Sequence, residues 1–324
     1  VDPQCGIDFE HYDYMKNTTI DGCNLYDNKK WDIINYNGTN IEIKNSNFSG
    51  GIATTYGNTM DIYNNKFEYR DTEKNDKVYK NASLSLGTNN NLVHDNEFIN
   101  GSASNSGANS KTYNNIFKNT DVTITSNDEN KYYNSKVGLR QNNNFTILEN
   151  NYFENCSVFN HNDSPSIEIS NCIFKDSTYK PRGETLISNC TFNMSSKPII
   201  DGWMTVYTKV TYKNCSFTSI YKSKIPLLGY NTSVVVTFES CNFNISRYWL
   251  GYIHENYVFN SCSFIFNDIN KSTDICHLNT FNGTATWAPI CWYFSNCYFK
   301  SDLPVKIYGG NILNPIIVGD IKIV

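Results

Sequence analysis

The sequence predicts an all-β protein built as a single parallel β-helix, and three observations support this. A four-residue motif recurs along the whole chain, short alternating strands precede several of its copies, and the composition favours strands and turns. The 324 residues include 23 Tyr and 19 Phe, which favour strands, and 50 Asn, which favour turns. The aromatic content of 15% argues against a disordered chain, and a coiled coil would be richer in Ala, Glu, Lys and Leu.

The repeated motif begins with Asn, Ser or Asp, continues with a small or polar residue and any third residue, and ends with Phe. Its copies end at Phe48, Phe67, Phe98, Phe117, Phe153, Phe174, Phe192, Phe217, Phe243, Phe264 and Phe299, and residues 22–25 form a degenerate first copy. The shortest intervals between these Phe residues, 18 to 21, match one coil of a β-helix. Longer intervals indicate either one coil with a loop insertion or two coils of which one lacks the motif. The chain then holds roughly a dozen coils.

Alternating segments such as 41–43, 60–62, 167–169, 210–212 and 235–238 predict strands with one face inward. Inside the motif the second and fourth residues share a face, so we expect Phe to stack in the core beside a ladder of Asn or Ser, replaced by Cys in the second half. The core ladder is assigned to Cys172, Cys190, Cys215, Cys241, Cys262, Cys297, Phe174, Phe192, Phe217, Phe243, Phe264 and Phe299. Stacked Asn side chains can hydrogen-bond one another, whereas Cys acts as a small buried hydrophobe.

The 11 Cys are expected to be mainly free thiols, because parallel side chains in register do not easily reach disulfide geometry. Cys5, Cys156, Cys276 and Cys291 lie off the ladder, and Cys276 with Cys291 is a candidate pair closing a loop. No CxxC, HxH or HExxH motif occurs, so we assign neither a metal nor a cofactor.

The domain organisation predicted is an N-terminal cap over 1–30, the β-helix over 31–300, and a C-terminal cap or assembly segment over 301–324. Caps are expected because the open ends of a solenoid invite aggregation, and an end without one can join another protomer. A β-sandwich is the structural alternative, but it does not require one fixed motif per strand.

These motifs resemble those of right-handed parallel β-helix surface proteins, and in particular the Asn/Thr-rich adhesin-like proteins of methanogenic archaea. The resemblance covers roughly residues 20 to 300. It implies a right-handed helix, a cell-surface location and an attachment role. Viral tailspikes, pectate lyases and polygalacturonases are similar helices, and they keep an enzymatic alternative open.

A ligand-binding surface is expected where aromatic residues gather, because exposed aromatic rings can stack on the apolar faces of sugars. The candidates are Trp203, Tyr207, Trp249, Tyr252, Trp287 and Trp292. Plain packing at the bases of loops is the alternative interpretation. The three long intervals 68–95, 118–149 and 265–296 are where loops are expected to build a binding surface.

Catalytic motifs are absent from the sequence, and we assign no catalytic residue. The adjacent Asp pair and the Gly-His-Gly of polygalacturonases do not occur. For a lyase with Ca²⁺, the nearest acidic clusters are 71–76 and Asp121 with Asp128 and Glu129, which are also explained as solvated loops.

The function expected is that of an exported, non-catalytic adhesin or receptor-binding protein at the cell surface, whose partner is a carbohydrate or another cell surface. A polysaccharide lyase or tailspike-like glycosidase is the first alternative, and a subunit of a surface filament or layer is the second. The net charge of −4 and only four Arg argue against nucleic-acid binding, and no apolar stretch is long enough to insert into a membrane. Glycosylation candidates are Asn17, Asn37, Asn81, Asn100, Asn144, Asn231, Asn270 and Asn282.

Overall fold

The structure is all-β and its long sheets are entirely parallel. It is a computed structural model. It describes residues 5–9, 15–26, 28, 31–54, 58–69, 82–125, 127–140, 146–161, 166–181, 183–195, 199, 209–219, 235–245, 251–252, 256–267, 276–277, 279–280, 292–307 and 311–323. No helix occurs in these ranges. The all-β class is confirmed, and the parallel sheets agree with a β-helix solenoid.

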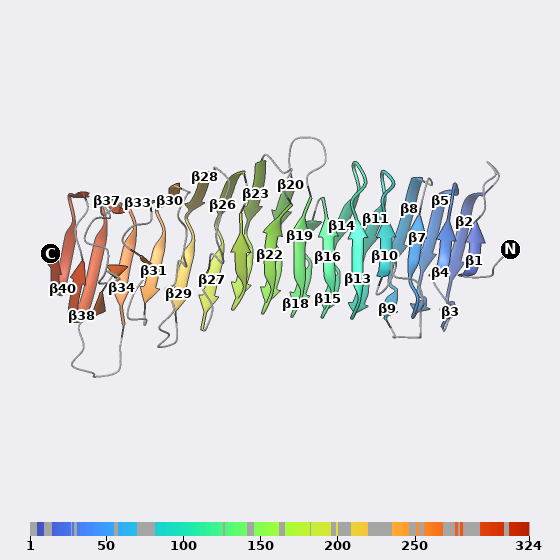
Figure 1. The fold of residues 1–324 in the computed structure, drawn as a ribbon, viewed down its shortest axis with the longest axis horizontal. Helices are drawn as coiled ribbons and strands as arrows, with labels where there is room; N and C mark the ends of the chain where they lie inside the picture. The colour runs from blue at the N-terminus through green and yellow to red at the C-terminus, as the bar shows by residue number, and fades with distance from the viewer. Residues whose placement is uncertain are drawn as a thin grey trace. The chain divides into compact units, whose positions relative to one another are not determined.

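Two compact units make up the chain, Val1–Tyr152 and Phe153–Val324. In the first unit the chain passes through three sheets in turn, which we call A, B and C (Figure 1). We call one passage through the three sheets a coil. Sheet A holds β1 (Cys5–Phe9), β4 (Trp31–Asn35), β7 (Ile52–Thr54), β10 (Ala82–Leu86), β13 (Ser102–Asn105), β16 (Asp121–Ile124) and β19 (Lys136–Leu139). Sheet B holds β2 (Lys16–Asp21), β5 (Thr39–Lys44), β8 (Asn58–Tyr63), β11 (Leu92–His94), β14 (Lys111–Tyr113), β17 (Asn127–Asp128) and β20 (Thr146–Glu149). Sheet C holds β3 (Asn24–Leu25), β6 (Asn47–Phe48), β9 (Lys66–Glu68), β12 (Glu97–Ile99), β15 (Ile116–Lys118) and β18 (Lys131–Tyr133).

The strands of the second unit belong to the same three sheets. Sheet A includes only two of them, β22 (Ser157–Asn160) and β25 (Thr178–Lys180). Its sheet B holds β23 (Ser166–Ser170), β26 (Glu184–Ser188), β28 (Lys209–Lys213), β30 (Val235–Glu239), β33 (Asn256–Asn260), β37 (Trp292–Ser295) and β39 (Asn311–Leu313). Its sheet C holds β24 (Ile173–Lys175), β27 (Thr191–Met194), β29 (Ser216–Ser219), β31 (Asn242–Ile245), β34 (Ser263–Phe266), β38 (Tyr298–Ile307), β35 (Cys276–His277) and β40 (Ile316–Ile323). A small separate sheet pairs β32 (Gly251–Tyr252) with β36 (Asn279–Thr280), and β21 (Tyr152–Glu154) spans the boundary between the units.

The Phe residues of the motif form stacks in both units. Phe48, Phe67 and Phe98 are register partners on neighbouring strands, with ring centroids 4.9 and 4.6 Å apart. In the second unit Phe174 to Phe299 stack in the same way, with neighbouring centroids 4.7 to 5.1 Å apart. All are buried, so these rings form a continuous core in each unit.

The first residue of the motif makes the corner between sheets B and C. Its φ is 52° at Asn45, 53° at Asn64 and 54° at Asn171, which is the left-handed region. Asn enters this region more readily than other residues with a Cβ. Much of the Asn content therefore follows from corner geometry.

The second residue of the motif forms a buried hydrogen-bonded ladder in the first unit. Each Asn side-chain oxygen accepts the backbone N–H of the ladder residue one coil earlier, as Asn96 does for Asn65 at 3.0 Å and Asn115 does for Asn96 at 3.0 Å. The side-chain nitrogen of Asn115 donates to the carbonyls of Val93 and Tyr113. The amide groups of this ladder are thereby satisfied.

Cys replaces Asn at this ladder position in the second unit, at Cys172, Cys190, Cys215, Cys241, Cys262 and Cys297, and all six are buried and free. Each thiol donates to the carbonyl two residues earlier, at 3.2 to 3.4 Å. The thiol thus keeps a local hydrogen bond while packing as an apolar group.

A second ladder, which the sequence motif did not reveal, lies at the corner between sheets C and A. Positive φ recurs at Asn119, Asn134, Asn155 and Asp176, and the residue after each is a buried Thr, Ser or Cys. Cys156 belongs to this ladder, because its N–H donates to the Ser177 hydroxyl at 2.9 Å. Cys156 thus lies off the motif ladder, as predicted, but is part of this second one.

The long intervals have two different origins. Phe98 pairs directly with Phe67 and Phe299 with Phe264, so those intervals are one coil with an insertion. The interval after Phe117 is instead two coils, because Tyr132 takes the Phe position and stacks on Phe117 at 4.9 Å. The expectation of a binding loop over 118–149 is corrected: its described residues form strands β16 to β20.

The two terminal segments expected to be caps also contain strands, and these pair in parallel with their neighbours in the three sheets. Strands β1, β2 and β3 of residues 1–30 pair with β4, β5 and β6. Strand β40 of residues 301–324 pairs with β38.

Candidate functional site: the lateral face of the first unit

The outer face of sheet B in the first unit carries two rows of side chains in register. One row runs through Lys44, Tyr63, His94, Tyr113, Asp128 and Glu149. The other row includes Glu42, Asp61, Leu92 and Lys111, with Ile147 on β20. Since alternate residues of a strand point to opposite faces, the buried Ile43, Ile62 and Val93 lie beneath them. We call these two rows the lateral face.

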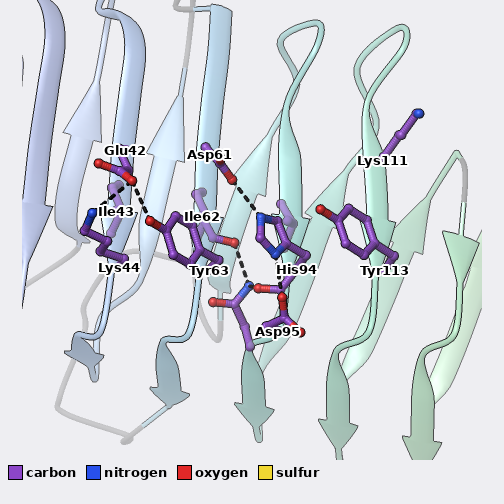
Figure 2. A network of polar contacts seen from close by, with 12 residues as sticks. Glu42, Ile43, Lys44, Asp61, Ile62, Tyr63, His94, Asp95, Lys111 and Tyr113 are labelled. Atoms are coloured by element: carbon purple, nitrogen blue, oxygen red, sulfur yellow. Dashed lines mark hydrogen bonds and ion pairs between the residues drawn. The ribbon is translucent and has the colours of Figure 1, made fainter.

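Three rings of the first row stack face to face. The Tyr63 and His94 ring centroids are 5.1 Å apart and those of His94 and Tyr113 are 4.7 Å apart, each pair inclined by 4° (Figure 2). The Lys44 Nζ lies 5.7 Å from the Tyr63 ring centroid and extends the column. Because the ring faces cover one another, the column offers ring edges and polar atoms to a ligand rather than flat aromatic faces.

His94 is held at both ring nitrogens. Its Nε2 lies 3.0 Å from Asp61 Oδ1, and its Nδ1 lies 2.6 Å from Asp95 Oδ2 (Figure 2). With both edges engaged by carboxylates and both faces covered by Tyr, the ring has a single orientation. His94 is therefore a fixed part of the face rather than a mobile side chain.

Glu42 is the hydrogen-bond acceptor at the other end of the column. It accepts the Tyr63 hydroxyl at 2.5 Å, the Lys44 ammonium at 3.0 Å and the Thr19 hydroxyl at 3.0 Å. The Tyr63 hydrogen bond, followed by those of Lys44 and Thr19, lowers the pKa of Glu42 to about 2. The same bond to Glu42 raises the pKa of Tyr63, so Tyr63 remains a neutral donor.

A hollow of ≈ 490 Å³ lies at the Tyr113 end of the lateral face, which is within the size range of ligand pockets. Its lining is formed by Leu92, Lys111, Thr112, Tyr113, Asp128, Ile147 and Glu149. Ile147 is 47% exposed and gives the hollow an apolar surface that a ligand can reach. Burial, followed by the charges of Asp61 and Asp95, raises the pKa of Tyr113 and keeps its hydroxyl protonated. The hollow thus combines a cation, two carboxylates, a hydroxyl and an apolar surface.

A second hollow of ≈ 680 Å³ follows the corner between sheets B and C. Its polar side chains already bind one another along the corner: Asn114 donates to Asp95, and Asn45 donates to Asp21 at 2.8 Å. We therefore assign it a structural role.

The aromatic residues expected to bind a ligand are not brought together in the described part of the chain. Trp203, Tyr207, Trp249 and Trp287 lie outside the described residues, and Tyr252 lies on β32 with its side chain undescribed. Trp292 is 0% exposed and packs against Tyr257 and Phe259, with ring centroids 5.0 and 5.4 Å away. Its assignment to the binding surface is corrected: Trp292 is a core residue, because its position on β37 points inward.

The candidate glycosylation sites, cysteines and acidic clusters also lie partly inside and partly outside the described residues. Asn17 and Asn100 are exposed at left-handed corners, with φ of 57° and 59°, and Asn37 is half-buried. The remaining glycosylation candidates, Asn81, Asn144, Asn231, Asn270 and Asn282, lie outside the described residues, as do Cys291 and the acidic cluster 71–76. Asp121 lies on sheet A and Asp128 on sheet B, so they belong to different faces. Within the described ranges, no three His, Cys, Asp or Glu side chains are placed to hold a metal ion.

A signal for the lateral face was nevertheless present in the sequence. The residue immediately before each motif copy is the outward residue of the first row, as in Tyr63 before Asn64, His94 before Asp95 and Tyr113 before Asn114. Alignment of the copies on their first residue would have placed these side chains in one column.

In comparisons with known proteins, no family model, no curated protein and no solved structure matches the chain. No membrane-spanning helix is found among the residues that the structure describes.

Proposed function

We propose that this chain is an exported surface protein, a right-handed parallel β-helix of roughly a dozen coils, that binds carbohydrate without cleaving it. The observation that carries the binding proposal is the hollow at the Tyr113 end of the lateral face, with its mixed polar and apolar lining. A sugar ring presents hydroxyl groups at its edge and C–H groups on its face, and this lining matches both. The surface location and the likeness to archaeal adhesin-like proteins rest on the sequence motifs alone.

The contacts expected follow from the lining. Asp128 and Glu149 supply acceptors for sugar hydroxyls, Lys111 and the protonated Tyr113 hydroxyl supply donors, and the exposed Ile147 supplies an apolar contact. Charged acceptors form the stronger hydrogen bonds to hydroxyl groups. The coil repeat sets neighbouring outward side chains ~4.8 Å apart, so one face can contact several units of an extended glycan.

The test is a glycan-array screen of the whole chain, followed by titration of the best glycan against Lys111→Ala and Ile147→Ala. Each substitution is expected to weaken binding by roughly tenfold or more, the equivalent of one charged hydrogen bond or one apolar contact. Lys209→Ala and Ile173→Ala are matched controls, because both residues are exposed on strands of the second unit, and they should bind as the parent does. Absence of any glycan binding, or equal losses in the control pair, would refute the proposal.

A glycosidase is the second candidate function, and one observation favours it. Asp128 and Glu149 are register partners on adjacent strands at the edge of the hollow. Adjacent strands are ~4.8 Å apart, close to the ~5–5.5 Å between the carboxyl groups of retaining glycosidases. A reducing-sugar assay on the bound glycan distinguishes the two functions. Reducing ends that the parent chain releases, and that neither Asp128→Asn nor Glu149→Gln releases, would favour the enzyme.

A further inference from the structure

The stacked column of the lateral face ends, at the hollow, in a hydroxyl group without a hydrogen-bond partner among the described residues. The Tyr63 hydroxyl donates to Glu42 at 2.5 Å, and both ring nitrogens of His94 face carboxylates. Tyr113 stacks on His94 with 4.7 Å between the ring centroids, so a neighbour of fixed orientation positions its ring (Figure 2). No described residue hydrogen-bonds to the Tyr113 hydroxyl, and its raised pKa keeps it a donor at the edge of the hollow.

The next strand places a hydrogen-bond acceptor beside this donor. Asp128 on β17 is the register partner of Tyr113 on β14, and both residues line the hollow. Asn150 donates to Asp128 Oδ1 at 3.0 Å, which orients the carboxylate. An ionised carboxylate accepts several hydrogen bonds, and neighbouring strands lie ~4.8 Å apart. One amide group can therefore donate its N–H to Asp128 and accept from Tyr113 with its C=O.

The apolar part of the hollow lies in the other row of the lateral face. Ile147 on β20 is 47% exposed, Leu92 on β11 is half-buried, and both line the hollow. Two residues along a strand separate the rows, a distance of ~6.6 Å. A methyl group attached to a ligand that hydrogen-bonds to Asp128 and Tyr113 is thus within reach of Ile147.

An acetamido group is the sugar substituent that uses all three contacts. Its N–H needs an acceptor, its C=O needs a donor and its methyl group needs an apolar neighbour. A hydroxyl group has no methyl, and a charged amine has no acceptor for the Tyr113 hydroxyl. We propose that the hollow selects glycans with N-acetylated amino sugars, which place the N–H on Asp128, the C=O on Tyr113 and the methyl on Ile147. This inference rests on the proposed function, because it names the sugar class for the same hollow.

Three oligosaccharides of one length and one linkage test the sugar class. At the same carbon, N-acetylchitotetraose carries acetamido groups, its deacetylated form carries amines and cellotetraose carries hydroxyls. Calorimetric titration of the 324-residue chain is expected to give a Kd for the acetylated form roughly tenfold or more below the other two, because they leave a hydrogen bond or the apolar contact unmade.

The outcomes separate this inference from carbohydrate binding itself. Equal affinities, or tighter binding of the amine or hydroxyl form, overturn the selection of acetamido groups and leave carbohydrate binding in place. If none of the three binds, the selection is overturned, and the glycan array decides whether carbohydrate binding falls with it.

Two variants of the column test the contact assigned to Tyr113. Tyr113→Phe removes the hydroxyl but keeps the stacked ring, and it is expected to lower the preference for the acetylated form over cellotetraose by roughly threefold or more. Tyr63→Phe is the matched control: it removes a hydroxyl that Glu42 already accepts, so the preference should stay as in the parent. Circular dichroism confirms that both variants are folded. An unchanged preference in Tyr113→Phe, or an equal loss in Tyr63→Phe, overturns the assignment.

Discussion

At the scale of single residues, neighbouring Asn side chains have opposite environments. Asn114 is exposed in the left-handed corner, whereas Asn115 is buried and accepts the backbone N–H and side-chain nitrogen of Asn96, both at 3.0 Å. One position requires a backbone conformation and the other requires hydrogen bonds. The same amino acid therefore recurs in adjacent positions for two different physical reasons.

Asn115→Ala is expected to lower the free energy of unfolding by about 1–3 kcal/mol, because it leaves the buried N–H of Asn96 without its acceptor. Asn114→Gly is the matched control and should change stability little, since Gly adopts positive φ freely. Thermal unfolding followed by circular dichroism measures both. Equal losses in the two variants would contradict the distinction between corner and ladder.

Glu42 makes stability depend on acid pH. Its pKa is about 2 in the folded chain against 4.5 ordinarily, so its contribution is present above pH 4.5 and is lost as the pH falls towards 2. Glu42→Gln is expected to remove that part of the pH dependence, so the difference in Tm between parent and variant should shrink between pH 5 and pH 2. A difference in Tm that stays constant over this range would argue against the Tyr63–Glu42 hydrogen bond.

At the scale of elements, the ladder at the corner between sheets B and C changes chemistry from one unit to the other. In the first unit each Asn oxygen accepts a backbone N–H at 2.8 to 3.0 Å, whereas in the second unit the thiols make longer contacts, at 3.4 to 3.5 Å, with a carbonyl of the preceding coil and with the carbonyl two residues earlier. Hydrogen bonds between neighbouring ladder thiols raise the pKa of Cys190 and Cys241, in the same direction as burial, and lower the pKa of Cys215 and Cys262, against burial. Whichever thiol of a neighbouring pair holds the proton, all six sulfur atoms belong to buried residues, and access limits thiol reactivity.

Iodoacetamide is therefore expected to leave the six ladder thiols unmodified in the folded chain and to modify them after unfolding. Cys23, which is only half-buried, is the internal control and should react first. Peptide mapping by mass spectrometry identifies the modified positions. Rapid modification of the ladder, or a disulfide between two of its neighbours, would contradict the packing described above.

At the scale of the whole molecule, the all-β class and the parallel sheets could be predicted because one coil cannot bury its inner face without copies of itself, and the copies leave a repeat in the sequence. The inward positions of Phe48 and Phe98 follow from that repeat. Tyr132 escaped it because two of the four motif residues differ in this copy, Glu129 at the first position and Tyr132 at the last. Trp292 was misplaced because a large aromatic residue suits either a core or a ligand. The lateral face was missed because its residue types vary from coil to coil, so Tyr63, His94 and Tyr113 form a recognisable column only once the coils are aligned with one another.

The constant register has a consequence for how the chain folds. Phe48 and Phe67 are register partners, as are Phe98 and Phe117, and the motif Phe residues of the second unit pair in the same way although 18 to 35 residues separate them along the chain. Because each coil pairs only with its neighbours, we expect folding within a unit to proceed by nucleation and growth, as in a one-dimensional crystal. The first pair of coils is then expected to form slowly, and later coils to add to an existing end. A substitution that disrupts one coil is expected to stop this growth and to leave the coils already formed intact.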